Sequence, residues 1–418
     1  MTSHRCRHCD TLLEQEVIDL GHQPPSNAYL SAAQLLEPEL TYPLKVYRCS
    51  ECWLVQLPAH AAADELFTAD YAYFSSTSSS WCAHAERFVT AAVERLGLDS
   101  DSLVVELASN DGYLLQYVAQ RGIPCLGIEP TAATAAAARA RGVDTLERFF
   151  GTPLAEELVQ QGRQADLVVA NNVLAHVPDI NDFLAGITRL LRPRGQASIE
   201  FPHLLRLLQG NQFDTIYHEH YSYLSLAVLR RIAARVGLAV IDVEELTTHG
   251  GSLRVWLARQ DGGSDGGLET PAQARRRVEA VLAAELTAGL ETAEAYAGFQ
   301  QRAEVAKHAL LRCLLDARER GERLLAYGAA AKGNTLLNYA GVRPDLLAAV
   351  ADQAPSKIGR FLPGSHIPVI APVELAAARP DALLVLPWNI AAEVKQQWGV
   401  AGYPPARFLR AIPTLEPV

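Results

Sequence analysis

Nine residues near the middle of the chain combine the side-chain types that catalyse proton transfer. Residues 213–221 hold two histidines, two tyrosines, an aspartate and a glutamate. Side chains of these types are rarely buried without a partner or a chemical task. The stretch therefore predicts the floor of a pocket for acid–base chemistry. The alternative is an ordinary turn that contains two incidental histidines.

Four of the seven cysteines form two CxxC turns, which lie about forty residues apart. They are Cys6, Cys9, Cys49 and Cys52. Two such turns complete a tetrahedral Zn²⁺ shell, and four sulfur ligands leave no open position, so we expect a structural zinc site. His4 and His8 are expected to be bystanders. The alternatives are a redox pair, for which no thioredoxin-like strand pattern is present, and a nucleic-acid-binding ribbon.

A nucleoside-binding unit is predicted after the cysteines. An apolar strand at 103–107, a tight turn at 108–112 and a helical pattern at 113–120 form the unit that places such a ligand over a helix N-terminus. Gly112 is the only glycine of the turn, which favours S-adenosylmethionine over NAD because the sulfonium cation needs no phosphate cradle. The next strand ends on Glu129, which can accept hydrogen bonds from ribose hydroxyls.

Further strands are predicted at 166–171, 196–201, 238–243 and 253–258. Their spacing indicates a mostly parallel doubly wound sheet that an antiparallel hairpin closes. Ligands of such sheets lie at the carboxyl ends of the strands. The polar residues expected at those ends are Glu106, Asp111, Glu129, Asn171, His176 and Glu200. The stretch 213–221 follows the strand at 196–201.

The last third of the chain repeats this pattern on a smaller scale. A helical bridge at 270–320 leads to a second strand, loop and helix at 324–335, with further strands at 346–351 and 382–386. Lys332 in this loop can bind a phosphate group, and Trp388 and Asn389 follow a later strand. These three residues would hold the nucleotide part of a substrate. Asp352 is a weaker candidate for a sugar hydroxyl, and a purely structural domain is the alternative.

Composition restricts the class of protein. A chain of 418 residues is expected to form two or three domains. Its net charge of −10 argues against nucleic acid as the main partner. Met1 leads into a polar segment, and no apolar run is long enough to cross a bilayer, so we expect a soluble cytoplasmic protein, monomeric or homodimeric. The aromatic, serine-rich stretch at 66–81 is expected to be a loop folded over a site.

Eight sequence blocks together resemble the S-adenosylmethionine-dependent sugar C-methyltransferases of deoxysugar biosynthesis, of the C-3-methyltransferase type. Besides the CxxC pairs and the tyrosine-rich loop at 71–74, the blocks are Glu-x-x-Ser-Asn-Asp-Gly at 106–112, Gly-Ile-Glu-Pro at 127–130, Asn-x-x-x-x-His at 171–176, Tyr-x-Glu-His at 217–220, His-Gly-Gly-Ser at 249–252 and Tyr-Gly-x-x-x-Lys at 327–332. The resemblance covers nearly the whole chain.

The resemblance implies an α/β protein of three parts. These are a small zinc-binding domain at 1–70, a doubly wound class I methyltransferase (Rossmann-like) domain at 71–265, and the helical bridge with a second, smaller Rossmann-like domain at 266–418. The middle domain would bind S-adenosylmethionine through Glu106, Ser109, Asn110, Asp111, Gly112, Glu129, Asn171 and Asn172. The acceptor would be a carbon beside the ketone of a 4-ketosugar linked to a nucleoside diphosphate such as thymidine diphosphate.

The same resemblance implies the catalytic roles. His220 would be the general base, Glu219 and Tyr217 would hold the keto oxygen, and Tyr71 and His176 would line the pocket. This is chemically reasonable, because a carbon acid needs a base poised near neutral pH and its enolate needs hydrogen-bond donors. Glu219 could donate only if protonated, and His218 could compete as the base. The alternative function is a zinc-ribbon-containing RNA or protein methyltransferase.

Overall fold

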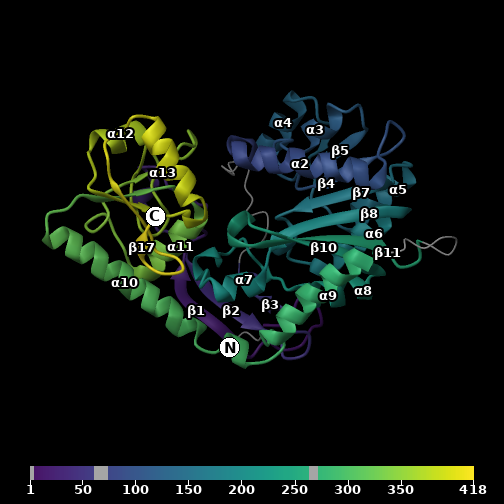
Figure 1. Cartoon of the computed structure of the whole chain (residues 1–418), viewed down its shortest axis with the longest axis horizontal. Coiled ribbons are helices and arrows are strands. Elements are labelled where there is room, and N and C mark those ends of the chain that lie inside the picture. Colours follow the sequence, from purple (N-terminus) through teal and green to yellow (C-terminus); the bar gives the residue numbers. More distant parts are fainter. Residues whose placement is uncertain (1–3, 61–73, 263–271) are drawn as a thin grey trace.

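The computed structural model describes residues 4–60, 74–262 and 272–418, which form three sheets. A seven-stranded and a six-stranded sheet form two lobes, and a four-stranded sheet joins them from below in the view of Figure 1. Within the described residues, no helix is both long and apolar enough to span a membrane.

The four-stranded sheet links the metal-binding segment to the middle of the chain. Its antiparallel order is β1 (Gln15–Gln23), β2 (Tyr42–Arg48), β3 (Val55–Gln56) and β9 (Ser222–Tyr223). Strand β9 follows the stretch 213–221 directly. The candidate catalytic residues are therefore anchored to the N-terminal segment by backbone hydrogen bonds.

The seven-stranded sheet has the order β10-β11-β8-β7-β4-β5-β6. Its strands are β4 (Val104–Leu107), β5 (Cys125–Ile128), β6 (Thr145–Leu146), β7 (Ala165–Asn171), β8 (Leu191–Pro202), β10 (Leu238–Leu246) and β11 (Ser252–Arg259). The five neighbouring strands β8, β7, β4, β5 and β6 pair in parallel, whereas β11 is antiparallel to both of its neighbours. The predicted doubly wound sheet with a closing hairpin is confirmed. All four residues of β4 are buried, as expected for a strand covered on both faces.

The helices of this lobe alternate with its strands along the chain. They are α2 (Ser79–Leu96), α3 (Leu115–Ala119), α4 (Ala132–Ala140), α5 (Thr152–Gln160), α6 (Ile180–Leu190), α7 (Leu204–Gln209) and α8 (Leu226–Arg235). The prediction of a loop at 66–81 is wrong from Ser79 onward, because the Ser78 hydroxyl accepts a hydrogen bond from the Trp81 amide and so caps a helix. Residues 66–73 of that stretch lie outside the described residues. Helix α7 also separates β8 from the stretch 213–221, which the sequence did not predict.

The C-terminal lobe confirms the predicted bridge and second doubly wound sheet. The helices of the bridge are α9 (Ala272–Thr287), which packs against β10 and α8 of the other lobe, and α10 (Phe299–Glu319). The other helices of the C-terminal lobe are α11 (Ala331–Ala340), α12 (Pro372–Ala377) and α13 (Ala391–Val400). Its sheet has the order β14 (Val369–Ile370), β13 (Val350–Ala351), β12 (Leu324–Tyr327), β15 (Ala382–Val385), β16 (Arg407–Arg410) and β17 (Glu416–Pro417). The strand predicted at 346–351 is shorter, because the amides of Leu346 and Leu347 form a turn on the Arg343 carbonyl.

One hydrophobic core connects the N-terminal sheet with the C-terminal lobe. Ile18 of β1 and Leu44 of β2 are fully buried in the same core as Phe299 and Leu337. A second core joins the cysteine-rich segment to the seven-stranded sheet. The N-terminal segment is thus packed against both lobes. The predicted boundaries at 70/71 and 265/266 both fall outside the described residues.

Candidate active site

His220 is held in one tautomer. Its Nδ1 lies 2.8 Å from the carbonyl oxygen of Thr215, and a carbonyl only accepts, so the proton of the neutral ring is on Nδ1. The side of the ring that can accept a proton is therefore Nε2. Burial, together with His176, lowers the pKa of His220 well below its usual 6.5. At neutral pH the imidazole is uncharged and can act as a base.

Tyr217 and His176 flank this imidazole. The centroid of the His220 ring lies 4.0 Å from that of Tyr217 and 4.6 Å from that of His176. His176 lies in the 3-10 helix η3 (Leu174–His176) after β7, and burial lowers its pKa to about 4. The structure thus brings the predicted residues 176, 217 and 220 together, whereas Tyr71 lies outside the described residues.

Glu219 is buried beside this cluster and turned toward the N-terminal segment. Its Oε1 accepts a hydrogen bond of 3.1 Å from Asn27 Nδ2, and the residue is only 1% exposed. Burial raises the pKa of the Glu219 carboxyl above its usual value. A raised pKa favours the protonated acid, the form in which this side chain can donate a hydrogen bond. Asn27 was not predicted from the sequence.

His218 faces a different part of the molecule from His220. Its Nε2 lies 3.3 Å from the Tyr42 carbonyl oxygen, and its ring packs edge-to-face on Tyr42 of β2 at 5.8 Å. Burial lowers its pKa to about 4. His218 therefore helps to pack the predicted catalytic stretch (residues 213–221) onto the N-terminal sheet.

The predicted cofactor turn is tightly built. Glu129 accepts backbone hydrogen bonds of 2.9 Å from Asn110 and from Thr131, which fix its carboxylate beside the turn. Gly112 has a φ of +78°, a conformation that other residues adopt at a cost. Gly127 lies so close to Ser109 that an added Cβ would meet its Oγ at 2.4 Å. The turn and β5 can pack closely only with glycine at 127.

Two of the predicted cofactor-binding residues, Asn110 and Asp111, form hydrogen bonds or ion pairs with other residues of the protein. The Ser75 amide donates to Asn110 Oδ1 at 2.9 Å, and the Ser76 hydroxyl donates to Asp111 Oδ2 at 2.5 Å. Arg141 forms an ion pair with the same Asp111 oxygen at 2.8 Å. Asn110 and Asp111 thus hold the segment that leads into α2 over the turn.

Other polar atoms at the carboxyl ends of β4 and β7 are buried without a hydrogen-bond partner among the described residues. They are both side-chain polar atoms of Asn171, Oε2 of Glu106 and Oγ of Ser109. Unsatisfied buried polar atoms cost free energy, and they are expected where a polar ligand binds. Burial also raises the pKa of Glu106 well above its usual value. These residues fit the polar groups of S-adenosylmethionine.

Aromatic side chains gather around Trp81. Trp81 of α2 stacks on His84 at 4.9 Å and contacts the edge of His249 at 5.1 Å. Asn172 Nδ2 donates to His249 Nε2 at 2.9 Å. This bond connects the aromatic cluster to Asn172, one of the predicted cofactor-binding residues. Trp81 was not singled out from the sequence, because it was assigned to the loop.

Glu200 at the end of β8 is satisfied by protein groups. Its carboxylate lies 2.9 Å from His84 Nε2, from Arg254 Nη2 and from Thr248 Oγ1. We therefore do not place this residue among the ligand-binding groups.

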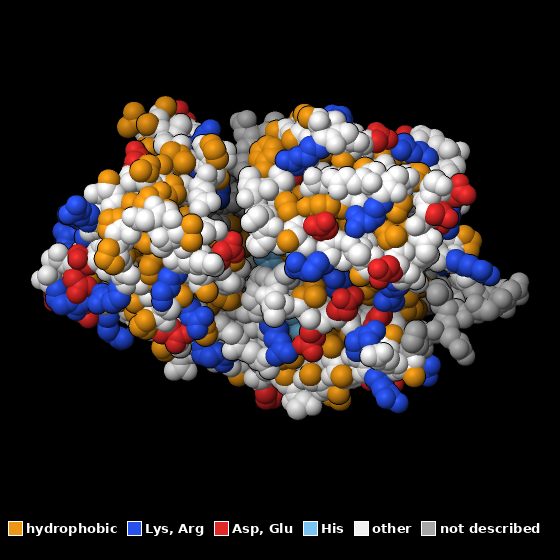
Figure 2. Space-filling model, turned by 45° about the horizontal axis from the view of Figure 1, so that its top comes forward, with side chains coloured by type: hydrophobic (Ala, Val, Ile, Leu, Met, Phe, Trp, Pro, Cys, Tyr) orange, Lys and Arg blue, Asp and Glu red, His pale blue; other side chains and the backbone are white. Residues whose placement is uncertain are grey.

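The three predicted nucleotide-binding residues assemble next to the catalytic stretch. Lys332 Nζ donates to Asn389 Oδ1 at 2.7 Å and lies 4.7 Å from the centre of the Trp388 ring. Trp388 Nε1 donates to Asp214 Oδ2 at 2.7 Å. Burial raises the pKa of Asp214 to about 6, opposed by the charge of Lys332. Figure 2 shows a groove between the two lobes with histidine visible at its floor.

Asp352 has a structural role at the loop between β12 and α11. Its two carboxylate oxygens accept backbone hydrogen bonds of 2.8 Å from Ala329 and from Ala354. The carboxylate thereby orders the loop before α11.

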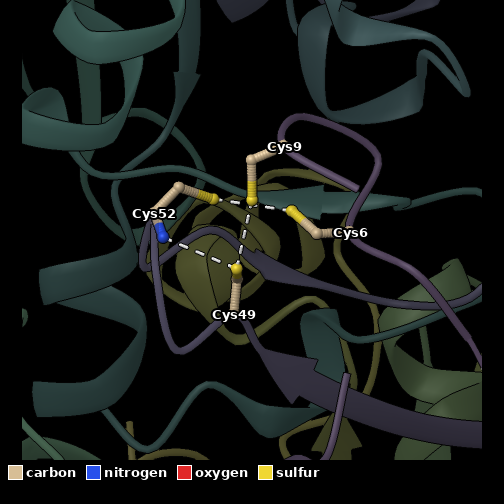
Figure 3. Close-up of side chains that lie close together, drawn as sticks. All are labelled: Cys6, Cys9, Cys49 and Cys52. Atoms are coloured by element: carbon tan, nitrogen blue, oxygen red, sulfur yellow. Dashed lines mark hydrogen bonds between the residues drawn. The ribbon is translucent and has the colours of Figure 1, made fainter. Parts of the chain in front are cut away.

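The four cysteines form a compact cluster (Figure 3). All four sulfur atoms lie within 4.8 Å of one another, with Cys6–Cys52 at 3.5 Å and Cys9–Cys49 at 3.4 Å. A tetrahedral zinc site with bonds of about 2.3 Å separates its sulfur atoms by about 3.8 Å, so the cluster fits Zn²⁺. His8 is not part of it, because its Nδ1 contacts Asn181 Oδ1 at 2.7 Å.

Comparison with known proteins gives matches along the chain. Family profiles match a zinc binding domain at residues 6–67, a methyltransferase domain at 81–243 and a C-methyltransferase C-terminal domain at 247–413. The C-methyltransferase NovU of Streptomyces niveus is 34% identical over 393 residues, which are 93% of this chain and 90% of NovU.

Solved methyltransferase structures match the chain in part. Magnesium protoporphyrin IX methyltransferase from Synechocystis PCC 6803 with bound S-adenosylmethionine has a TM-score of 0.31 and 17% identity, over 42% of this chain and 79% of that one. An S-adenosylmethionine-dependent methyltransferase from Clostridium acetobutylicum has a TM-score of 0.34 and 11% identity, over 42% and 90%.

Proposed function

Since this chain belongs to the C-methyltransferase family and is an S-adenosylmethionine-dependent C-methyltransferase, we propose that its acceptor is a nucleotide-linked 4-ketosugar, of the thymidine diphosphate deoxysugar type. The methyl group is added to the carbon beside the ketone. The observation that supports this most is the hydrogen bond from Trp388 to Asp214. It brings the 3-10 helix Trp388–Ile390, which lies against Lys332 of α11, to the acid–base stretch.

His220 acts as the general base. Its Nε2 takes the proton from the carbon beside the ketone, while Nδ1 remains bonded to the Thr215 carbonyl. A general base placed in this way contributes roughly 10²–10⁴-fold to the rate. After methyl transfer, the proton leaves His220 for solvent and the base is regenerated.

Glu219 and Tyr217 stabilise the charge that develops on the ketone oxygen. Deprotonation moves an electron pair into an enolate, and hydrogen-bond donors at its oxygen lower the barrier. A neutral Glu219, favoured by burial, and the phenol of Tyr217 are the donors. His176 completes the wall of the pocket, and Tyr71 is proposed to line it as well.

The carboxyl ends of β4, β5 and β7 hold the methyl donor. The residues are Glu106, Ser109, Asn110, Gly112, Glu129, Asn171 and Asn172, with Asp111 fixing the turn. When bound, S-adenosylmethionine supplies an electrophilic methyl group on its sulfonium centre. The enolate carbon would gain that methyl group as the S–CH₃ bond breaks and the ketone re-forms, with S-adenosylhomocysteine as the leaving group.

The remaining parts of the chain bind the nucleotide of the acceptor and hold the structural metal. Lys332, Trp388 and Asn389 bind the nucleoside diphosphate, so that remote binding energy positions the sugar. Cys6, Cys9, Cys49 and Cys52 hold a structural Zn²⁺. These roles correspond to a zinc-binding domain at 1–70, a methyltransferase domain at 71–265 and a nucleotide-binding region at 266–418.

Calorimetric titration with thymidine diphosphate, with and without S-adenosylhomocysteine, tests the acceptor class. We expect micromolar binding that Lys332→Met weakens, whereas Lys395→Met in α13 is the matched control and leaves it unchanged. Absence of thymidine diphosphate binding, with S-adenosylhomocysteine binding retained, would contradict a nucleotide-linked acceptor.

A further inference from the structure

The segment between β1 and β2 belongs to the metal-binding part of the chain but contacts both lobes. Tyr29 Oη donates to the Ala329 carbonyl at 2.5 Å, and Asn334 Nδ2 donates to the Ser26 carbonyl at 2.6 Å. Leu30 and Phe361 exchange backbone hydrogen bonds of 3.0 and 2.8 Å. These contacts fix the segment against the loop that leads into α11.

Asn27 lies within this segment, and it contacts the catalytic stretch. Its Nδ2 donates to Glu219 Oε1 at 3.1 Å. The other carboxyl oxygen of Glu219, Oε2, is buried and has no hydrogen-bond partner among the residues that the structure describes. The two oxygens of one carboxyl group are therefore in different environments.

We propose that Asn27 is a positioning residue of the active site, which fixes the Glu219 carboxyl so that Oε1 accepts and Oε2 presents the proton. This rests on the proposed role of Glu219 as a donor to the enolate oxygen. An amide NH₂ group can only donate, so Oε1 must remain the acceptor, and the proton of the neutral acid lies on Oε2. The segment between the two cysteine pairs thereby contributes a positioning residue to the active site.

The titratable side chains around Glu219 are uncharged near neutral pH, which is consistent with a neutral Glu219. Tyr29 and Tyr223 are both buried, and burial raises the pKa of each phenol, so neither ionises near neutral pH. Burial lowers the pKa of His176, and this ring is also neutral. Burial raises the pKa of Glu219, while the hydrogen bond from Asn27 opposes that rise. Removing the amide should therefore raise the pKa of Glu219 further.

Asn27 also connects Glu219 to the nucleotide-binding lobe. Its neighbours Ser26 and Tyr29 hold the start of α11, where Lys332 lies, and the Thr335 hydroxyl donates to the Ile216 carbonyl at 2.9 Å. The position of Glu219 therefore depends on contacts from the N-terminal segment and from the C-terminal lobe.

The test compares Asn27→Ala with Ser31→Ala, which removes the hydrogen bond from Ser31 to Gln34 in the same segment. With a thymidine diphosphate 4-ketosugar as acceptor, we expect Asn27→Ala to lower kcat up to about 100-fold, as expected for a misplaced catalytic group. Activity needs the protonated form of Glu219, and the variant should raise the pKa of this carboxyl. The alkaline limb of the kcat–pH profile should therefore move to higher pH, while S-adenosylhomocysteine affinity and zinc content are unchanged. A kcat within about threefold of the parent, or an unmoved alkaline limb, would contradict the proposal.

Glu219→Leu separates the two proposals, because leucine removes the hydrogen-bond donor whereas glutamine would keep one. If this variant is inactive and Asn27→Ala is fully active, the role of Asn27 is wrong and that of Glu219 stands. If Glu219→Leu is fully active, the proposed role of Glu219 is wrong. Infrared spectroscopy needs no acceptor. The carboxylic acid C=O band that Glu219→Gln removes should shift in Asn27→Ala and stay in place in Ser31→Ala. A band that does not shift in Asn27→Ala would also overturn the proposal.

Discussion

Trp388 Nε1 donates a hydrogen bond of 2.7 Å to Asp214 Oδ2, across 174 positions of the sequence. The indole also lies under Lys332 Nζ and against the backbone of Gly250, where an added Cβ would meet the ring at 2.4 Å. One aromatic side chain therefore connects the C-terminal loops to the catalytic stretch and to the loop between β10 and β11.

Replacing the Trp388 indole by a phenyl ring should weaken this connection. Trp388→Phe keeps an aromatic surface for Lys332 but leaves a buried carboxylate oxygen without its donor. We expect a loss of about 1.5–3 kcal/mol in the free energy of unfolding, measured in urea, and weaker thymidine diphosphate binding. The matched control is Trp398→Phe, because Trp398 Nε1 donates to the Pro404 carbonyl within the same lobe. Equal effects of both variants on nucleotide affinity would contradict the assignment.

His220 should be necessary for turnover but not for cofactor binding. Asn at this position can still donate toward the Thr215 carbonyl but provides no base. We expect His220→Asn to lower kcat by roughly 10²–10⁴-fold, with near-normal S-adenosylhomocysteine affinity by calorimetry. His218→Asn, which alters the ring next to Tyr42, should lower kcat less than about tenfold. The reverse order of the two effects would make His218 the base.

His218 should make stability depend on pH. Its folded-state pKa of about 4 lies below the usual 6.5, so the unfolded chain binds the proton more tightly. The stabilisation is present above pH 6.5 and is lost as the pH falls toward 4. This group should account for a loss of about 2 kcal/mol between pH 7 and pH 5. Urea unfolding of His218→Asn should therefore show a smaller decrease over this interval than the parent protein, and equal decreases would refute the assignment.

The sequence predicts most of the elements and the metal site, because these depend on local patterns. The CxxC spacing identifies four cysteines that the structure brings together, and apolar runs predict β4, β5, β7 and β8. Asn27 was missed because its function depends on a contact with Glu219, 192 positions away, that no local pattern encodes. Trp81 was missed because serines that cap a helix were interpreted as part of a loop. Asp111 could be located, but its pairing with Arg141 depends on tertiary packing.

Asn171 offers a test of the cofactor site that separates binding from stability. Both polar atoms of its side chain are buried without a partner among the described residues, so in the free protein they are destabilising. We expect Asn171→Ala to weaken S-adenosylhomocysteine binding by about 5–30-fold, equivalent to about 1–2 kcal/mol. The free energy of unfolding of the ligand-free protein should stay unchanged or rise. A loss of stability together with normal ligand affinity would instead assign Asn171 a structural role.

Removal of the metal should affect catalysis through the N-terminal sheet. Cys6, Cys49 and Cys52 are buried in the core that they share with the seven-stranded sheet, and β3 pairs with β9 directly after the catalytic stretch. Structural Zn²⁺ contributes directly to folding energy. Treatment with a strong zinc chelator should therefore increase amide hydrogen exchange in residues 15–56 and 222–223 and abolish methyl transfer. S-adenosylhomocysteine should still bind, because the turn after β4 is formed within the seven-stranded sheet. Loss of S-adenosylhomocysteine binding before any change in exchange at 15–56 would show that the metal supports the cofactor site instead.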